Sequence, residues 1–223
     1  MKTSEVGRNA LEWSVGNSIW VMTTDNSGAI GEKPGDHVKV SYHIVAYFSF
    51  RSAVLDCLSA GALPATVILH NFCGDHVWDK LVEGVNQGLE ELGLQDVVVT
   101  GSTESNMSLN QSAVAITIIG ERKRHFAIPS QGTIEWDLIG EPLVGMDVIK
   151  KSDRIAPLSK AIELFSDEET IVFWPIGSKG IRQEWSNLSD RFNWSETPPP
   201  FNEDIDASAG PSTCWILGRK HDQ

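Results

Sequence analysis

The sequence predicts an α+β protein of two domains: a mixed sheet with helices on one face in the N-terminal half, then a reduced α/β domain. Strand-like and helix-like segments alternate along the chain, without the fixed spacing of a repeat protein. A charged run at 121–125 separates the two halves, so we expect domains at residues 1–125 and 126–223. With 223 residues and 41% hydrophobic content, the chain has enough apolar side chains to form a core.

The N-terminal half begins with strand patterns. Residues 18–23 alternate with β-branched and aromatic side chains, which predicts a strand that ends in a polar turn at 24–28. After a second turn at Lys33-Pro-Gly-Asp36, residues 37–45 have the pattern of another strand, and 65–70 are rich in β-branched residues. These segments supply the first three strands of the expected mixed sheet.

A short helix at residues 51–64 is central to the prediction. Its apolar residues recur at the spacing of one buried helix face: Ala53, Val54, Cys57, Leu58 and Ala60. Its polar residues form a second stripe: Ser52, Asp56 and Ser59. Asp is a poor residue for a helix interior, because its side chain competes for backbone groups. Asp56 therefore either faces solvent or has a functional reason to be there.

A longer helix is expected at residues 75–92, with Asp75 placed to cap it. Residues 96–100 and 113–119 then have strand patterns, joined by a polar loop that begins at Gly101. Helices on one face of a sheet leave its other face bare. A second copy of the chain would cover that face, so the sequence predicts a homodimer.

The C-terminal half is expected to be smaller and also α/β. Its predicted elements are a turn and strand at 140–148, a helix at 157–165, strands at 170–174 and 213–217, and a helix at 181–188 that follows a Gly-rich turn. Residues 193–211 are polar and Pro-rich and predict an irregular segment.

Charge and cysteine content restrict the function classes. The formal net charge of −12 repels nucleic acid and anionic membrane surfaces, so we expect neither as a partner. The three cysteines form no Cys-x-x-Cys pair, which indicates neither a zinc site nor a disulfide framework and fits a reducing cytoplasm. No signal-peptide pattern and no run of eighteen apolar residues is present. We therefore expect a cytoplasmic protein.

Three acidic residues stand where they could share a metal ion. Asp25 follows a predicted strand, Asp56 lies on the short helix, and Glu104 lies in a predicted loop between strands. Carboxylates on separate elements can converge on Mg²⁺ and leave coordination places for phosphate oxygens and water. The alternative is that each acid caps an element or faces solvent.

Polar loops next to these acids are candidate phosphate contacts. Asn26 and the run Gly101, Ser102 and Thr103 can offer backbone N–H groups to phosphate oxygens. Lys179 lies in a Gly-rich turn, but the full pattern G-x-x-x-x-G-K-[ST] is absent, so we reject a Walker-type site. No G-x-S-x-G elbow and no H-E-x-x-H pair occurs.

The segment that carries Asp56 resembles a known family. Asp56-x-x-Ser-Ala-Gly-Ala-Leu-Pro64 is similar to the Asp-x-x-Ala-Met-Gly-Ala-x-Pro helix of the aminoimidazole ribonucleotide synthetase superfamily, which includes thiamine monophosphate kinase and selenophosphate synthetase. The helix at 75–92 and the segment 97–103 resemble the helix and the Gly-Gly-Asp-Thr loop of that family. The resemblance covers 18–120 well and the remainder loosely.

The resemblance implies a two-domain enzyme that binds ATP with Mg²⁺ and pairs as a homodimer, sheet to sheet. The catalytic and metal-binding residues that it implies are Asp25, Asp56 and Glu104. The nucleotide contacts that it implies are Asn26, Gly101, Ser102, Thr103 and, more weakly, Lys179. Ser102 stands where the family has Asp, so Glu104 would supply that carboxylate. The family's acid after the second strand is also missing at Ser41-Tyr-His43.

Within the superfamily, the short C-terminal half and the loop Gly101-Ser-Thr-Glu104 most resemble the α-ribazole kinases of cobalamin lower-ligand salvage. That likeness implies phosphorylation of the 5′-hydroxyl of α-ribazole, with Trp194 and Phe201 forming a slot for its flat ring. Two alternatives stay open: another ATP-dependent transfer of the superfamily, such as phosphorylation of thiamine monophosphate, or a catalytically silent nucleotide-binding protein.

Overall fold

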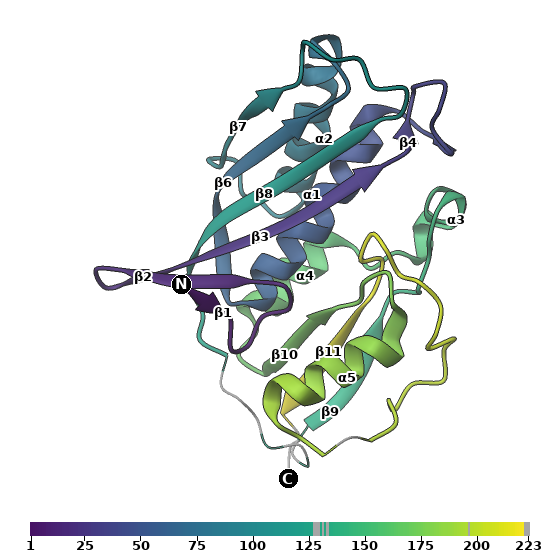
Figure 1. Ribbon diagram of the computed structural model, residues 1–223. Helices are drawn as coiled ribbons and strands as arrows, with labels where there is room; N and C mark the ends of the chain where they lie inside the picture. The colour runs from purple at the N-terminus through teal and green to yellow at the C-terminus, as the bar shows by residue number, and fades with distance from the viewer. Residues whose placement is uncertain (127–129, 131, 133, 196, 221–223) are drawn as a thin grey trace.

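The structure is a computed structural model that describes residues 1–126, 130, 132, 134–195 and 197–220 (Figure 1). Its main strands are β1 (Lys2–Thr3), β2 (Leu11–Val15), β3 (Ser18–Gly28), β4 (Ile30–Gly31), β5 (Val38–Lys39), β6 (Ala62–Asn71), β7 (Val98–Thr103), β8 (Ala113–Arg122), β9 (Ile134–Ile139), β10 (Thr170–Pro175) and β11 (Trp215–Lys220). Its helices are α1 (Tyr42–Ser59), α2 (Trp78–Glu91), α3 (Met146–Lys150), α4 (Leu158–Ser166) and α5 (Gly180–Phe192), with short 3₁₀ turns η1 (Asp75–Val77) and η3 (Ser152–Arg154).

The large sheet has six strands in the order β1-β2-β3-β8-β6-β7. All neighbours are antiparallel except β6 and β7, so the sheet is mixed. Along β8, Ile116 and Ile118 are fully buried towards the helices, whereas Thr117 between them points to the other face. Figure 1 shows α1 and α2 behind this sheet and no helix in front of it. The predicted α+β class, with helices on one face of a mixed sheet, is confirmed.

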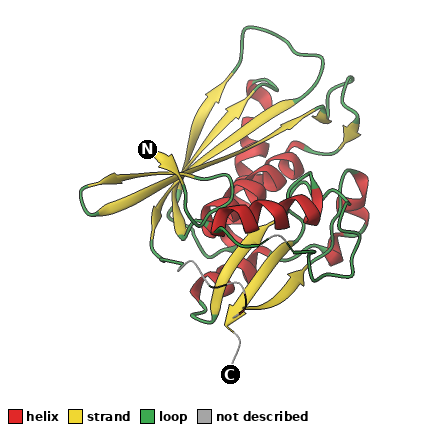
Figure 2. Ribbon diagram, turned by 60° about the horizontal axis from the view of Figure 1, so that its bottom comes forward, coloured by secondary structure: helices red, strands yellow, loops and turns green. Residues whose placement is uncertain are grey.

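Helix α1 differs most from its prediction. It begins at Tyr42, so the strand expected at 37–45 is wrong, and only Val38–Lys39 form the short strand β5. Fourteen of its 18 residues are buried, because α1 packs against β3 and β8 on one side and against β10 and α2 on others. The helix predicted at 51–64 identifies only the second half of α1, and its residues 62–64 belong to β6 instead. Its position between the two sheets can be followed in Figure 2.

Two predicted loops are strands. β3 continues to Gly28 because β8 pairs with it along its whole length, so Asp25 and Asn26 lie in a strand rather than in a turn. In the same way, the run from Gly101 to Thr103 belongs to β7, where it pairs with β6. The structure thus moves these candidate residues from flexible turns onto the sheet.

Helices α1 and α2 approach each other closely at two glycines of α2. A Cβ atom on Gly84 would lie 2.2 Å from the carbonyl oxygen of His43, and one on Gly88 would lie 2.4 Å from the ring of Phe50. Contacts this short leave room only for glycine. The predicted helix at 75–92 is confirmed, with its first turn as 3₁₀ helix, but Asp75 does not cap it: its Oδ1 accepts a hydrogen bond from the Ser105 hydroxyl at 2.9 Å.

The C-terminal half forms a three-stranded antiparallel sheet in the order β10-β11-β9. The strand expected within 140–148 is wrong: the strand is β9, before that range, and α3 follows it. The two faces of the small sheet serve two cores. Trp215 and Leu217 pack into the core around α1, whereas Ile216 between them packs against α5. A division of the chain into domains at residue 125 stays a prediction.

The Pro-rich segment does not form the expected stacking slot. Trp194 packs edge-on against Trp136, with ring centroids 5.8 Å apart, and Phe201 packs against Trp185 at 5.9 Å. Both pack against the core around α5 and line neither of the two cavities described below. None of the helices in the described part of the chain is long and apolar enough to span a lipid bilayer.

Candidate functional site

A cavity of about 640 Å³ lies where the large sheet and α1 meet the loops of the C-terminal half. Its N-terminal wall is the end of β3, from Thr24 to Gly28, together with the polar stripe Ser49, Ser52 and Asp56 of α1. Its C-terminal wall combines apolar residues in and around α3 with small residues in loops: Gly145, Gly177, Ser178, Gly210 and Ser212. The cavity is large enough for a nucleotide-sized molecule.

Asp25 and Asp56 face each other across the contact between β3 and α1. The Thr23 hydroxyl donates a hydrogen bond to the Ala53 carbonyl at 2.7 Å, which fixes β3 against α1 beside the two acids. Strand alternation then turns Asp25, two residues after Thr23, towards the helix as well. Asp56 is 3% exposed, so the solvent-facing interpretation of this residue is wrong.

Arg8 joins the site to the C-terminal half. This residue lies between β1 and β2, and its Nη1 donates to Asp56 Oδ1 at 2.9 Å while its Nε donates to Glu184 Oε1 at 2.9 Å. Glu184, on α5, also accepts a hydrogen bond from Trp174 Nε1 at 3.1 Å. One guanidinium therefore connects α1 and α5, and it gives Asp56 a positive partner.

Burial raises the pKa values of both acids. The pKa of Asp25 rises to about 7, first because the carboxyl is removed from water and then because Asp56 is negative. The pKa of Asp56 rises to about 6 through burial, which the neighbouring Arg8 charge partly offsets. Because the ionised forms of the two carboxyl groups are destabilised, the pair provides a favourable site for a further cation.

The donor set fits Mg²⁺. Asp25 and Asp56 supply carboxylate oxygens, and Ser49 and Ser52 line the same cavity with hydroxyl groups. Mg²⁺ prefers hard oxygen donors. A site with few protein donors suits it, because the ion keeps several water or phosphate ligands. Within the described ranges, no cluster of three or more His, Cys, Asp and Glu side chains could hold a metal, so the protein supplies two acids here rather than three.

Glu104 does not join Asp25 and Asp56 within one chain. Its carboxylate accepts hydrogen bonds from the backbone N–H groups of Asn106 and Met107, at 2.7 and 3.0 Å, and so closes its own loop. The loop follows β7 at the edge of the sheet. β7 is three strands from β3, which corresponds to roughly 14 Å.

The other candidate nucleotide contacts also fall into two groups, one at the large cavity and one away from it. Asn26 lines the large cavity beside Asp25. Gly101 and Ser102 lie exposed on β7, and Thr103 accepts a hydrogen bond from Asn71 Nδ2 at 3.0 Å. Lys179 is exposed at the start of α5, next to Ser178 of the cavity wall. The structure therefore brings together Asp25, Asn26 and Asp56 and leaves the others outside this cavity.

Arg8 is the main residue of the site that the sequence pattern does not predict. It belongs to no periodic segment or motif, and its partners Asp56 and Glu184 are 48 and 176 positions away along the chain. The polar stripe of the 51–64 helix was a usable signal, because Ser52 and Asp56 share it and both line the cavity. Ser49, three residues before Ser52, continues that stripe.

No protein-family model matches the chain, and no curated protein sequence matches it either. Solved structures do match its fold. AaThiL complexed with AMPPCP and TMP is similar with a TM-score of 0.68 and 12% identity, over 98% of this chain and 81% of that chain. Thiamine monophosphate kinase from Aquifex aeolicus has a TM-score of 0.66 and 13% identity, over 96% of this chain and 84% of that one. T. maritima PurL complexed with ATP has a TM-score of 0.58 and 14% identity, over 97% of this chain but 39% of that one.

These similarities extend along nearly the whole chain, although few residues are identical. They include the C-terminal half, where the resemblance of the sequence was loose. The chain therefore has the aminoimidazole ribonucleotide synthetase-like fold that it shares with thiamine monophosphate kinase and PurL.

Proposed function

We propose that the protein is an ATP- and Mg²⁺-dependent kinase for a small molecule. The observation that carries the proposal is the pair of buried carboxylates, Asp25 and Asp56, in a cavity of about 640 Å³ walled by Gly- and Ser-containing loops. The fold adds support, because solved structures with the same fold are complexes with AMPPCP or ATP. The negative charge of the chain also makes a cation necessary if it is to hold phosphates.

In this proposal the residues act mainly by positioning. Asp25 and Asp56 hold Mg²⁺, which when bound neutralises charge on the phosphate oxygens. The loops at Gly177 and Gly210 let backbone groups approach a phosphate closely, because no side chain intervenes. Arg8 keeps Asp56 ionised and oriented. Phosphoryl transfer requires little covalent help, so such positioning supplies most of the rate enhancement.

The acceptor that we propose is α-ribazole, phosphorylated at its 5′-hydroxyl in the cytoplasm. The loop Gly101-Ser-Thr-Glu104 supports this choice over other members of the superfamily. We further propose that Gly101, Ser102, Thr103 and Glu104 contact nucleotide or metal in a homodimer.

The test is an acceptor screen with ATP and Mg²⁺, followed by mass spectrometry of the products. α-Ribazole 5′-phosphate is the expected product. Formation of thiamine diphosphate from thiamine monophosphate would retain the kinase class and reject the acceptor. Binding of ATP without turnover of any acceptor would favour a silent nucleotide-binding protein.

A further inference from the structure

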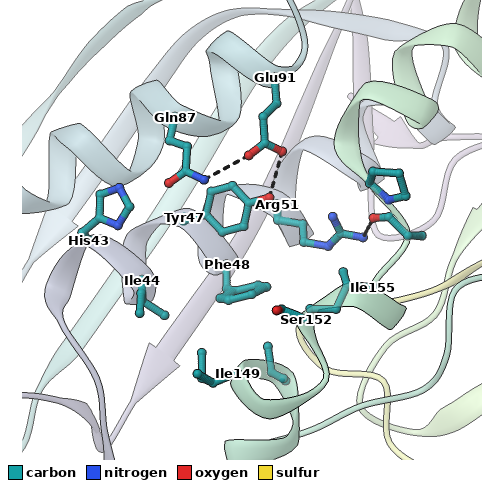
Figure 3. A pocket seen from close by; sticks show the side chains of 13 residues that line it. His43, Ile44, Tyr47, Phe48, Arg51, Gln87, Glu91, Ile149, Ser152 and Ile155 are labelled. Carbon is teal, nitrogen blue, oxygen red and sulfur yellow. Dashed lines mark hydrogen bonds between the residues drawn. The ribbon is translucent and has the colours of Figure 1, made fainter.

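A second cavity, of about 410 Å³, lies on the neighbouring side of α1 (Figure 3). It is enclosed by α1, by the end of α2 and by the segment from α3 to Pro157. Figure 3 shows the Tyr47 and Phe48 rings on one side of it and Ile149 and Ile155 on the other. The side chains at its centre are thus aromatic and aliphatic, which suits a flat apolar group.

Two charged residues line the cavity, one of each sign, so the lining has no net charge. Glu91 accepts hydrogen bonds from the Tyr47 hydroxyl at 2.9 Å and from Gln87 Nε2 at 3.0 Å. Arg51 is fully buried, and its Nε donates to the Ser212 carbonyl at 3.0 Å and its Nη2 to the Ala156 carbonyl at 2.5 Å. The lining therefore offers no net opposite charge to a phosphate or another ion. A neutral ring does not need such a charge in order to bind.

The buried guanidinium retains unused hydrogen-bonding capacity. Nη1 of Arg51 has no hydrogen-bond partner among the residues that the structure describes, although the Tyr47 hydroxyl lies near enough to interact with its charge. A buried donor without a partner is energetically unfavourable.

The two cavities adjoin. Ile44 and Phe48 of α1 and Val148 and Ile149 of α3 line both of them. Phe48 and Asp56 are eight residues apart on one helix, which is about 12 Å along its axis. A molecule with its ring in the smaller cavity can therefore extend past Phe48 and bring a hydroxyl group towards the carboxylates.

We infer that the smaller cavity binds the flat, uncharged, mostly apolar ring of the phosphoryl acceptor, with the acceptor hydroxyl directed to the Asp25–Asp56 site. The inference rests on the proposed kinase function and adds the chemical class of the acceptor. The dimethylbenzimidazole ring of α-ribazole meets these requirements, since it is flat, largely apolar, neutral near pH 7 and has a ring nitrogen at its edge. Thiamine monophosphate, with a cationic thiazolium ring, does not.

The test blocks the smaller cavity with a bulky side chain introduced at its edge. Ser152 is exposed and lines only the smaller cavity, so Ser152→Trp places an indole into it; Asp153→Trp, the next residue of the same turn, is the matched control. The affinities of each variant for 5,6-dimethylbenzimidazole, for α-ribazole and for ATP with Mg²⁺ are measured by calorimetry. Ile155→Trp, three residues further along the same segment, replaces Ser152→Trp if circular dichroism shows that the latter is unfolded.

We expect Ser152→Trp to weaken binding of both ring compounds by about tenfold or more, with ATP affinity unchanged, and Asp153→Trp to match the wild type. Unchanged ring binding in a folded blocking variant overturns the inference, even if the wild type phosphorylates α-ribazole. Loss of ATP affinity instead assigns the cavity to adenine and also overturns it. A wild type that binds the ring here but transfers no phosphate rejects the kinase proposal and leaves the ring site standing.

Discussion

At the scale of single residues, Asp25 contributes to the pH dependence of the stability of the metal-free protein. Its pKa of about 7 exceeds the ordinary 3.8, so the folded protein keeps a proton that the unfolded chain releases. The contribution of Asp25 to the free energy of unfolding is therefore fully present below about pH 4. It is lost as the pH rises through 7. We expect the free energy of unfolding of the wild type to fall from pH 5 to 8 by about 2 kcal/mol more than that of Asp25→Asn.

Urea denaturation in the presence of a chelator measures this difference. Asp96→Asn is the control, because Asp96 is exposed near the end of α2 and far from the pair. The control should follow the wild type across the range. Parallel curves for the wild type and Asp25→Asn would show that Asp25 titrates normally in the folded protein.

The charge of Asp56 can be removed with little change of shape. Asn has a similar helical preference, so α1 should persist in Asp56→Asn, while one of the two carboxylates of the large cavity is lost. We expect affinity for ATP with Mg²⁺ to fall by about tenfold or more, measured by calorimetry. Glu184→Gln is the matched control, since it also removes a partner of Arg8 but lies outside that cavity. Equal ATP affinity in Asp56→Asn and the wild type would exclude Asp56 as a metal or phosphate organiser.

Residue chemistry also explains how much of the site the sequence could predict. Asp56 was identifiable because a carboxylate inside a helix of small residues is unfavourable unless it has a partner. Arg8 was not, because its role depends on two partners that folding brings from distant parts of the chain. Glu104 had the right chemistry, yet its distance from Asp25 follows from strand order, which a single sequence does not specify.

At the scale of elements, the amphipathic helix α2 was predictable, whereas the start of the buried helix α1 was not. Helix α2 has one exposed and one buried face, so its spacing and its length agree with the prediction. The segment that leads into α1 and its first residues alternate the apolar side chains Val38, Val40, Tyr42 and Ile44, which is the pattern of a strand. This segment is helical because α1 packs between the two sheets. The residues that form this packing are distant in the sequence, so a local pattern does not reveal it.

The contact between α1 and α2 gives a prediction at this scale. Gly84→Ala adds a Cβ 2.2 Å from the His43 carbonyl oxygen and 2.9 Å from the Tyr47 nitrogen, both backbone atoms that cannot turn away. The resulting separation of the helices should cost about 2 kcal/mol in the free energy of unfolding, despite the better helical preference of Ala. Asn86→Ala, on the exposed face of α2, is the control and should be neutral or slightly stabilising. Equal midpoints of chemical denaturation for the two variants would contradict this packing.

At the scale of the whole molecule, the described chain is layered and one outer face is bare. From α5 inwards, the layers are the small sheet, the helices around α1, and the large sheet, whose far face no described helix covers (Figure 1). That face carries Met22, Ile68 and Ile119 among polar side chains, all only partly buried. A sheet face with apolar residues is normally covered, and pairing of two such faces would cover both.

We therefore predict a homodimer that pairs through the open face of the large sheet. Light scattering at micromolar concentration should give about twice the chain mass of 24.5 kDa.

Thr117→Arg places a charge at the centre of this face, on β8, and should shift the protein to the mass of a single chain, because an unpaired buried charge is strongly unfavourable. Asn86→Arg adds the same charge on the opposite side of the layer, on α2, and should leave the dimer intact. A wild type with the mass of one chain would exclude the pairing, and a dimer that survives Thr117→Arg but not Asn86→Arg would place the interface on the helices.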